Sequence, residues 1–280
     1  MEERHSLILG FFDGVHKGHR EVIKTACCGE KSVLITFKDS PALYFGKNVE
    51  YILPREKSYE IIKSLGVDEI VEQDFSTLAE ISADDYLDLL VKKYSPVSIS
   101  TGFNHTFGKG RLGNSEFLTQ NQTKYNYKYF CSPACVIDDE VVSSTKIREF
   151  LMQGNIEKAN EFLDSNFLIK STVIEGAKLG RQLGFPTANM IYPNGIVRIP
   201  YGVYAVKVSD KPAILNWGVK PTVNGKTEFL EVHIPNYEAD LYNLPLEVEF
   251  IKKIRDEKKF ANLDELKHQI KKDVEECLKL

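Results

Sequence analysis

The first half of the chain alternates short apolar runs with amphipathic stretches. The runs have the length of β-strands, and the stretches between them carry apolar residues at helical spacing, as Val22, Ile23 and Ala26 do. The apolar runs lie at 6–12, 32–37, 67–71 and 97–101. Strands separated by helices pair in parallel through right-handed crossovers. We therefore predict an α/β domain with a doubly wound, Rossmann-like sheet, whose ligands bind in the loops that follow the strands.

The second half changes to strands with few helices between them. Two helices are predicted at 144–153 and 156–163. The strands that follow are predicted at 168–174, 202–208, 213–217, 228–234 and 246–251. This pattern predicts a small antiparallel β-barrel, and we place the two domains at 1–163 and 164–280.

End signals mark several of the predicted helices. Pro54 opens one helix and Gly66 ends it, where a left-handed residue is favoured. Ser82 and Asp85 resemble a capping box. Asn262 caps the terminal helix, whose apolar stripe is Leu263, Leu266, Ile270, Val274 and Leu278.

Charge and composition exclude several classes of protein. The 280 residues include 36 basic and 40 acidic ones, and these are mixed along the chain, so a nucleic-acid partner is not expected. No apolar run approaches the roughly 20 residues needed to span a bilayer, and the first residues show no cleavable leader. We expect a cytoplasmic protein without a membrane partner, acting as a monomer.

The segment 10–19 follows the first strand and opens the first helix. A helix N-terminus presents free N–H groups to a phosphate, and glycines let the backbone approach it closely. In adenylyl transfer an oxygen attacks the α-phosphate of ATP, and the enzyme orients the groups and stabilises the developing charge. His16 and His19 are the catalytic candidates as donors to the phosphates. The ATP-binding candidates here are Gly10, Phe11, Asp13, Gly14 and Gly18.

A second phosphate-binding candidate begins the helix at 144–153. The hydroxyl side chains at its start have two interpretations. They cap the helix, or they bind an anion at its N-terminus. Arg148, one turn into the helix, favours the anion through its forked donors. With the histidine motif present, we predict that ATP contacts Ser143, Ser144, Thr145 and Arg148.

Any phosphorylation by this chain needs a phosphate cradle other than a P-loop, because no Gly-x-x-x-x-Gly-Lys-Ser/Thr motif occurs. The candidate is the glycine-rich segment 176–189. Thr187 and Asn189 lie two residues apart and so face one side of an extended segment, where their oxygens suit hydrated Mg²⁺ on ATP. The ATP-binding candidates are Gly176, Gly180, Arg181, Gly184, Pro186 and Asn189.

Together, these motifs resemble the bacterial bifunctional riboflavin kinase/FAD synthetases over essentially the whole chain. The histidine motif with 143–148 looks like the nucleotidylyltransferase superfamily, and Thr101–Gly113 resembles the loop of the bifunctional enzymes that contacts flavin and nucleotide. Further matches are 53–57, 65–68, 202–206, 216–222, 230–234, 240–242 and 255–260. The resemblance implies conversion of riboflavin to FMN in the barrel and of FMN to FAD in the first domain.

The resemblance also implies roles for single residues. It makes Glu231 the general base that takes the proton of the riboflavin 5′-hydroxyl. Asn104 and Arg255 are the implied flavin-binding residues. Riboflavin, FMN and ATP are the implied small-molecule partners, with Mg²⁺ as the cofactor.

Three positions depart from the family pattern. The family has an aromatic residue where this chain has His105, and a Pro and a His where it has Asp39 and Ser40. Two alternatives therefore stay open beside the bifunctional enzyme. One is a riboflavin kinase with weak or lost adenylyltransferase activity, and the other is a non-catalytic regulator that senses flavin or nucleotide.

Overall fold

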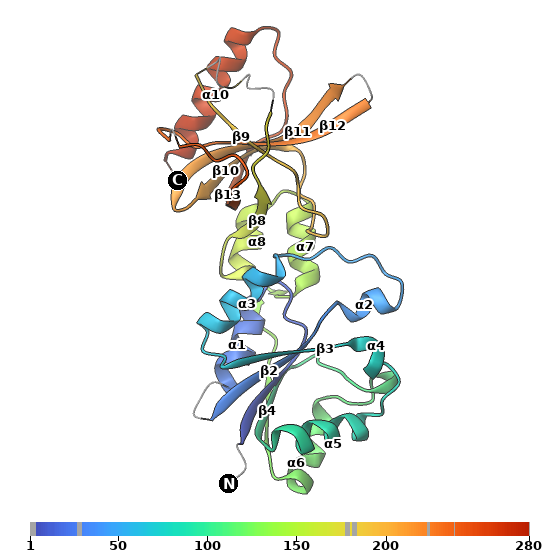
Figure 1. Ribbon diagram of the computed structural model, residues 1–280. Coiled ribbons are helices and arrows are strands. Elements are labelled where there is room, and N and C mark those ends of the chain that lie inside the picture. The colour runs from blue at the N-terminus through green and yellow to red at the C-terminus, as the bar shows by residue number, and fades with distance from the viewer. Residues whose placement is uncertain are drawn as a thin grey trace. The chain divides into compact units, whose positions relative to one another are not determined.

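The computed structural model describes residues 4–26, 30–176, 180, 184–222, 225–237 and 239–279. The chain forms two compact units, coloured along the chain in Figure 1. The first comprises Met1–Val49 and Arg55–Ser144, and the second comprises Glu50–Pro54 and Thr145–Leu280. This division falls after the first residue of α7 (Ser144–Met152), so the rest of α7 and all of α8 (Ile156–Leu163) belong to the second unit, whereas the sequence places the boundary at 163/164. The Asn160 carboxamide of α8 donates to the Phe250 carbonyl at 2.8 Å, which accounts for the grouping of α8 with the barrel.

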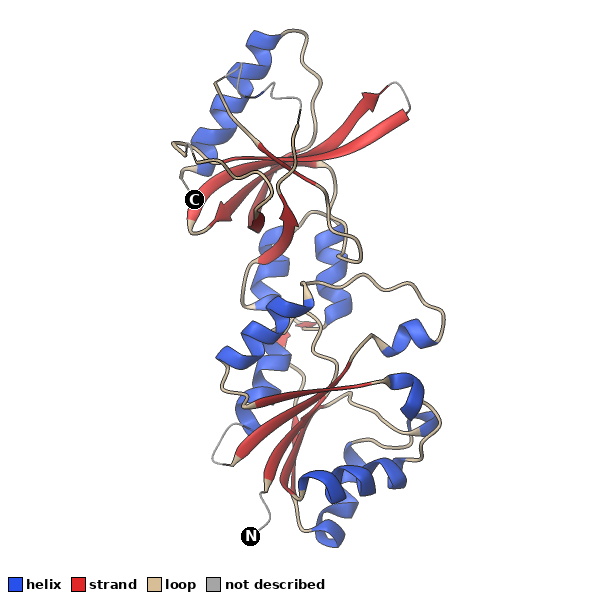
Figure 2. Cartoon of the chain, in the orientation of Figure 1, coloured by secondary structure: helices blue, strands red, loops and turns tan. Residues whose placement is uncertain are grey.

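The first unit is built on a five-stranded parallel sheet. The strands are β1 (His5–Leu9), β2 (Lys31–Phe37), β3 (Glu69–Gln73), β4 (Pro96–Gly102) and β5 (Lys128–Ser132), in the order β3-β2-β1-β4-β5. Helices lie on both faces of this sheet (Figure 2). They are α1 (Lys17–Ala26), α3 (Arg55–Ser64), α5 (Ala83–Tyr94) and α6 (Ser115–Tyr125), with the short α2 (Pro41–Tyr44) and α4 (Phe75–Leu78). The predicted doubly wound fold is confirmed.

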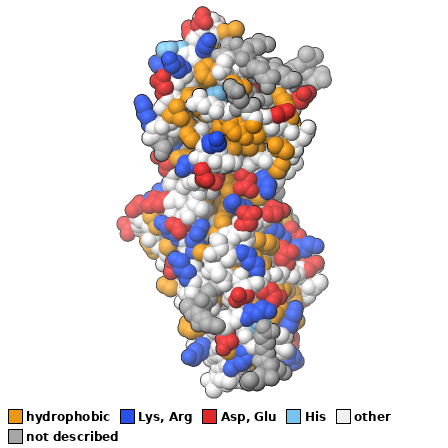
Figure 3. Space-filling view, turned by 60° about the vertical axis from the view of Figure 1, so that its left-hand side comes forward, with side chains coloured by type: hydrophobic (Ala, Val, Ile, Leu, Met, Phe, Trp, Pro, Cys, Tyr) orange, Lys and Arg blue, Asp and Glu red, His pale blue; other side chains and the backbone are white. Residues whose placement is uncertain are grey.

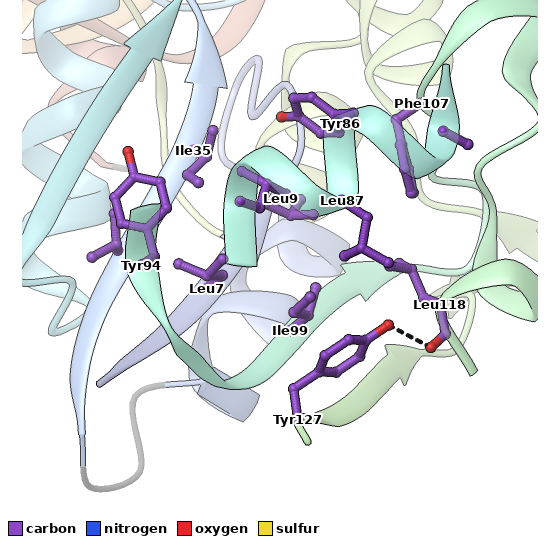
Figure 4. Close-up of a cluster of buried hydrophobic side chains, with 13 residues drawn as sticks. Leu7, Leu9, Ile35, Tyr86, Leu87, Tyr94, Ile99, Phe107, Leu118 and Tyr127 are labelled. Atoms are coloured by element: carbon purple, nitrogen blue, oxygen red, sulfur yellow. Dashed lines mark hydrogen bonds between the residues drawn. The ribbon is translucent and has the colours of Figure 1, made fainter. Parts of the chain in front are cut away.

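Alternate residues of β1 supply the two cores of this unit. Leu7 and Leu9 belong to one cluster with Ile99 of β4, and Ile8 belongs to the other with Ile23 of α1. Figure 4 shows the first cluster, in which the Tyr127 hydroxyl donates to the Leu118 carbonyl at 2.6 Å. Burial on both faces explains why the central strands are continuous apolar runs in the sequence.

The second unit contains a six-stranded antiparallel sheet. Its strands are β8 (Phe167–Thr172), β9 (Ala188–Met190), β10 (Gly202–Val208), β11 (Lys211–Thr222), β12 (Gly225–His233) and β13 (Pro245–Arg255), in the order β8-β13-β10-β11-β12-β9. Beyond β8, the Ile174 amide donates to the Asn189 carbonyl of β9 at 2.8 Å. This bridge joins the two edges of the sheet, so the predicted small barrel is confirmed.

The terminal helix α10 (Leu263–Cys277) begins as predicted, because the Asn262 side chain accepts from the Glu265 amide. The predicted apolar stripe is wrong in part. Leu263 and Leu278 are 57% and 53% exposed. The deeply buried side chains of the helix are Asp273 and Cys277. Asp273 accepts hydrogen bonds from Arg255 of β13 and the Cys277 thiol donates to the Ala213 carbonyl of β11, so polar contacts anchor α10.

The predicted helix ends of the first unit are confirmed. Gly66 has a φ of 96°, the left-handed conformation that its place after α3 requires. Ser82 accepts from the Asp85 amide at 3.0 Å and caps α5.

No helix within the described ranges is long and apolar enough to cross a membrane. The face of the molecule in Figure 3 mixes acidic and basic side chains and shows no continuous basic area.

Candidate functional site

A strained loop leads from β1 into α1. Gly14 and Val15 both have positive φ, 81° and 45°, and for a buried β-branched residue this is an uncommon conformation. The Arg20 guanidinium donates to the Val15 carbonyl at 3.0 Å, which holds the loop from the first turn of α1. A strained backbone conformation persists where contacts with the surrounding structure hold it, and such residues are common at ligand-binding sites. The Arg20 contact is one that holds Val15 in this conformation.

The two histidines of this loop stack on each other. Their ring centroids are 3.6 Å apart at an interplanar angle of 15°, and the His19 amide donates to His16 Nδ1 at 3.3 Å. Because Nδ1 of His16 accepts, the proton of its neutral ring is on Nε2. Nδ1 of His19 is buried and has no partner in the described part of the chain.

Burial keeps both rings neutral. It lowers the pKa of His16 to about 4, and burial together with the neighbouring His16 lowers the pKa of His19 well below its usual range. At pH 7 each ring therefore offers one N–H donor without a formal charge. The motif favours hydrogen bonding to phosphate oxygens over simple charge pairing.

The histidine loop lies at the switch point of the sheet. β1 pairs with β2 on one side and β4 on the other, so the loops after β1 and β4 leave the same edge of the sheet. In doubly wound folds ligands bind outside the carboxyl ends of the strands at this point. The exposed Asn104 and the adjacent His105 follow β4. Burial lowers the pKa of His105 to about 4, and its Nε2 is a second imidazole nitrogen without a partner among the described atoms.

The structure brings the start of the predicted 143–148 segment to the histidine loop. The Ser144 hydroxyl donates to the Asp13 carbonyl at 3.0 Å, although 131 positions separate the two residues. Thr145 and Arg148 belong to the second unit, and the Arg148 guanidinium donates to the Glu50 carbonyl of that unit at 2.8 Å. The phosphate contacts predicted for Thr145 and Arg148 stay predictions.

Strand register unites the predicted residues of the barrel. Glu231 of β12 lies directly opposite Asn189 of β9 on one side and opposite Asn216 of β11 on the other. Directly opposed residues share a face, with Cβ atoms about 5 Å apart. Leu230 and Val232 point into the core and are buried, so Glu231 between them lies on the opposite face of the strand.

The glycine-rich segment packs on these same residues. A Cβ on Gly176 would lie 2.3 Å from the Asn189 carboxamide, and one on Gly180 would lie 3.3 Å from the Thr187 side chain. The Phe185 amide donates to the Gly180 carbonyl at 2.8 Å, which folds the segment back on itself. The segment therefore lies against the two predicted metal ligands, while Arg181 lies outside the described residues.

Glycine and proline at the end of the segment shape its turn. Gly184 has a φ of 88°, a left-handed conformation that glycine adopts without steric cost. The Pro186 carbonyl accepts from His233 of β12 at 2.8 Å. This contact ties the segment to the strand that carries Glu231.

Hard oxygen donors at this position fit Mg²⁺ held mainly by nucleotide phosphates. Thr187 supplies a hydroxyl and Asn189 an amide oxygen, and neither is a ligand that zinc prefers. The described residues contain no group of three or more His, Cys, Asp or Glu side chains that suits a metal ion.

Arg255 has a structural partner that sequence reasoning missed. Its guanidinium donates to the buried Asp273 carboxylate of α10, with Nη2 at 2.7 Å and Nε at 3.0 Å from Oδ2. Nη1 donates to the Asp256 carbonyl at 3.0 Å. An acidic residue on a polar terminal helix normally indicates a solvent-exposed face, so no local signal singled out Asp273.

Known proteins match both units in order. The chain matches the FAD synthetase family model at residues 1–146 and the riboflavin kinase family model at residues 163–280. The bifunctional riboflavin kinase/FMN adenylyltransferase of Haemophilus influenzae is 36% identical over 96% of this chain and 92% of its own length. The enzyme of the same name from Bacillus subtilis is 32% identical over 98% of this chain and 91% of its own length. A crystal structure described as a macrolide-efflux protein from Streptococcus pneumoniae has a TM-score of 0.90 at 27% identity, covering 100% of this chain and 96% of its own.

Proposed function

This chain belongs to the family of bifunctional riboflavin kinase/FMN adenylyltransferases, and we propose which of its residues carry each of the two reactions. It is an enzyme with two activities. The region 163–280 phosphorylates riboflavin to FMN, and the region 1–146 adenylylates FMN to FAD.

The kinase reaction belongs to the row of polar residues on β9, β12 and β11. Glu231 takes the proton of the riboflavin 5′-hydroxyl while the oxygen attacks the γ-phosphorus of ATP, and ADP leaves as the bond to the bridging oxygen breaks. The observation that carries this proposal is the direct pairing of Glu231 with Asn189, which sets the proposed base beside the proposed metal and phosphate ligands.

Thr187 and Asn189 hold the Mg²⁺ that accompanies ATP, and this ion neutralises charge on the phosphates. The backbone of the glycine-rich segment lies against the same two side chains, so phosphate oxygens meet N–H groups there. Gly176, Gly180, Gly184 and Pro186 shape this cradle, and Arg181 supplies the positive charge.

The adenylylation reaction belongs to the loop between β1 and α1. A phosphate oxygen of FMN attacks the α-phosphorus of ATP, and pyrophosphate leaves. His16 and His19 donate N–H groups to the phosphate oxygens, and because both rings stay neutral at pH 7, they stabilise developing charge as fixed dipoles.

Neighbouring residues complete the proposed nucleotide contacts of the first unit. Backbone groups around Gly10, Phe11, Gly14 and Gly18 face the phosphates, with Asp13 held through Ser144. Ser143 adds a side-chain donor, and Asn104 contacts the flavin. ATP contacts of Thr145 and Arg148, which belong to the second unit, stay predictions.

A single incubation tests the two activities. Purified protein is incubated with riboflavin, ATP and Mg²⁺, and FMN and FAD are separated by chromatography. Formation of both supports the bifunctional enzyme. FMN without FAD, also when FMN is the added substrate, identifies a kinase with a lost adenylyltransferase activity, and neither product identifies a regulator.

We also propose that the enzyme acts in the cytoplasm, where ATP is supplied, as a monomer and without a nucleic-acid partner. Light scattering of the purified chain tests the monomer. A mass of two or more chains would contradict it.

A further inference from the structure

Strand pairing extends the row from Asn216 across two more strands, first to the buried apolar Val203 and then to Arg255. Asn216 of β11 pairs with Glu231 on one side and with Val203 of β10 on the other. Val203 in turn pairs with Arg255 of β13. Four adjacent strands therefore place Glu231, Asn216 and Arg255 in one line across the sheet. With neighbouring strands about 4.8 Å apart, the line from Glu231 to Arg255 is about 14 Å long.

The loop after β13 returns over this face of the sheet. Gly218 lies two residues beyond Asn216 on β11 and shares its face. A Cβ on Gly218 would lie 1.8 Å from the Glu257 carboxylate, so the loop touches the strand beside Asn216. The Arg255 guanidinium lies over the Phe260 ring, with Cζ of Arg255 5.8 Å from the ring centroid. An aromatic and charged loop therefore borders one end of the line, and the proposed base stands at the other.

Asn216 lies on the line between Glu231 and the loop after β13. Its carboxamide is half-buried and makes no hydrogen bond to any residue that the structure describes. The adjacent Leu215 and Trp217 point to the opposite face and are buried in the core, so the direction of Asn216 is fixed. A half-buried amide that finds no protein partner keeps a donor and an acceptor for a ligand.

We infer that Asn216 binds the ribityl hydroxyls of riboflavin and aligns its 5′-hydroxyl with Glu231. This inference rests on the proposed kinase function. The substrate is a planar ring joined to a polyhydroxyl chain that ends in the reacting hydroxyl, and the line across the strands offers groups in the same order. The loop at 255–260 meets the ring, Asn216 meets the chain, and Glu231 meets the terminal hydroxyl.

The test compares riboflavin with lumiflavin, which has the same ring and no hydroxyl chain. Riboflavin phosphorylation is measured in the full-length protein, and lumiflavin is added as a competitive inhibitor. In Asn216→Ala, the KM for riboflavin should rise on the order of tenfold, as expected for loss of one or two ligand hydrogen bonds. The inhibition constant of lumiflavin should stay within about twofold of the wild-type value, because its contacts to the ring do not involve Asn216.

Two further variants separate contact from structure. Asn216→Ser replaces the carboxamide with a hydroxyl, which still offers a donor and an acceptor on the same face, and it should recover part of the loss. Lys211→Ala changes an exposed residue at the start of the same strand and should leave both constants unchanged.

Two results would overturn the inference alone. One is an unchanged KM in Asn216→Ala, and the other is a rise of the lumiflavin constant in parallel with KM. A wild-type chain that forms no FMN would instead overturn the proposed kinase function and this inference together.

Discussion

At the scale of single residues, burial decides what the histidines of this protein do. His16, His19 and His105 all have pKa values far below that of free imidazole, and desolvation is the leading cause for each. A solvent-exposed His–x–Gly–His motif would carry partial positive charge near neutral pH. In this fold the same residues are neutral donors held in place, which suits transition-state hydrogen bonding.

Replacing both histidines of the loop should remove adenylylation selectively. In His16→Ala/His19→Ala, conversion of FMN to FAD should fall by at least about 10²–10³, the effect of losing one preorganised donor. Riboflavin phosphorylation should continue, because it belongs to the other unit. FAD formation at the normal rate in the double variant would contradict the assignment.

The same histidines should make the stability of the protein depend on pH. His16 has a pKa of about 4 when folded and about 6.5 when unfolded, so unfolding takes up a proton between these values. The free energy of unfolding should therefore fall as the pH drops below about 6.5, by about 2 kcal/mol from His16 at pH 5. Thermal melts at pH 7 and pH 5 should show a smaller loss in the double variant than in the wild type. Equal losses would show that the rings are not buried neutral.

Glu231 should be required for FMN formation alone. Glu231→Ala removes the proposed base, so riboflavin phosphorylation should become undetectable while FMN added from outside is still converted to FAD. Glu247→Ala is a suitable control, because Glu247 is a partly exposed carboxylate that pairs with Lys170 at 3.5 Å. Phosphorylation by Glu231→Ala at a near wild-type rate would exclude this base.

At the scale of elements, two contacts between strands, helices and loops shape the proposed kinase site. Each involves a residue that none of the sequence motifs includes. The bridge from Ile174 to Asn189 closes the barrel at the strand that carries the proposed metal ligand. The Arg255–Asp273 pair anchors α10 to the root of the loop at 255–260. Since the donors Nε and Nη2 of Arg255 bind Asp273, and Nη1 donates to Asp256, we expect Arg255 to position this loop for flavin.

Asp273→Asn should loosen both α10 and the flavin loop. Loss of one partner from a buried ion pair leaves a charge uncompensated, and the expected cost is about 3 kcal/mol of unfolding free energy. The KM for riboflavin should rise, while conversion of FMN to FAD stays at the wild-type rate. Asp264→Asn, on the exposed first turn of the same helix, is the control. A wild-type KM in a folded Asp273→Asn protein would show that the pair serves stability only.

At the scale of the whole molecule, the two activities belong to separate sets of residues. The proposed adenylylation residues His16, His19 and Ser144 lie in the first unit, and the proposed kinase residues Thr187, Asn189 and Glu231 lie in the second. Because each unit has its own sheet and core, damage to one site should leave the other intact.

Two variants that each lack one of the activities should therefore complement each other in solution. Glu231→Ala supplies a working adenylyltransferase and His16→Ala/His19→Ala a working kinase. A mixture of the two should convert riboflavin to FAD, with FMN released by one chain and taken up by the other. Chromatography of the products after equal incubation checks this. Absence of FAD from the mixture, with both single activities present, would show that FMN does not leave the chain that makes it.

Local sequence patterns determined the elements and the candidate residues. Helix caps such as Asn262 and alternation such as that around Glu231 depend on contacts between near neighbours in the chain, so they can be predicted without the fold. The glycine-rich and histidine motifs were recognised for the same reason. The order of strands and helices in the first half predicted the parallel sheet through the handedness of its crossovers.

Only the tertiary structure decided how these residues meet. The register that sets Asn189 opposite Glu231 joins β12 to β9, which lies much earlier in the chain with two strands between them, and no local pattern encodes it. Asn216 lies on the consecutive strand β11, and its pairing with Glu231 is the more local of the two. The same is true of the ion pair between Arg255 and Asp273. The pKa values of the histidines also depend on desolvation by distant residues. Registers, buried ion pairs and desolvation are long-range consequences of packing, and so they emerge only when the chain has folded.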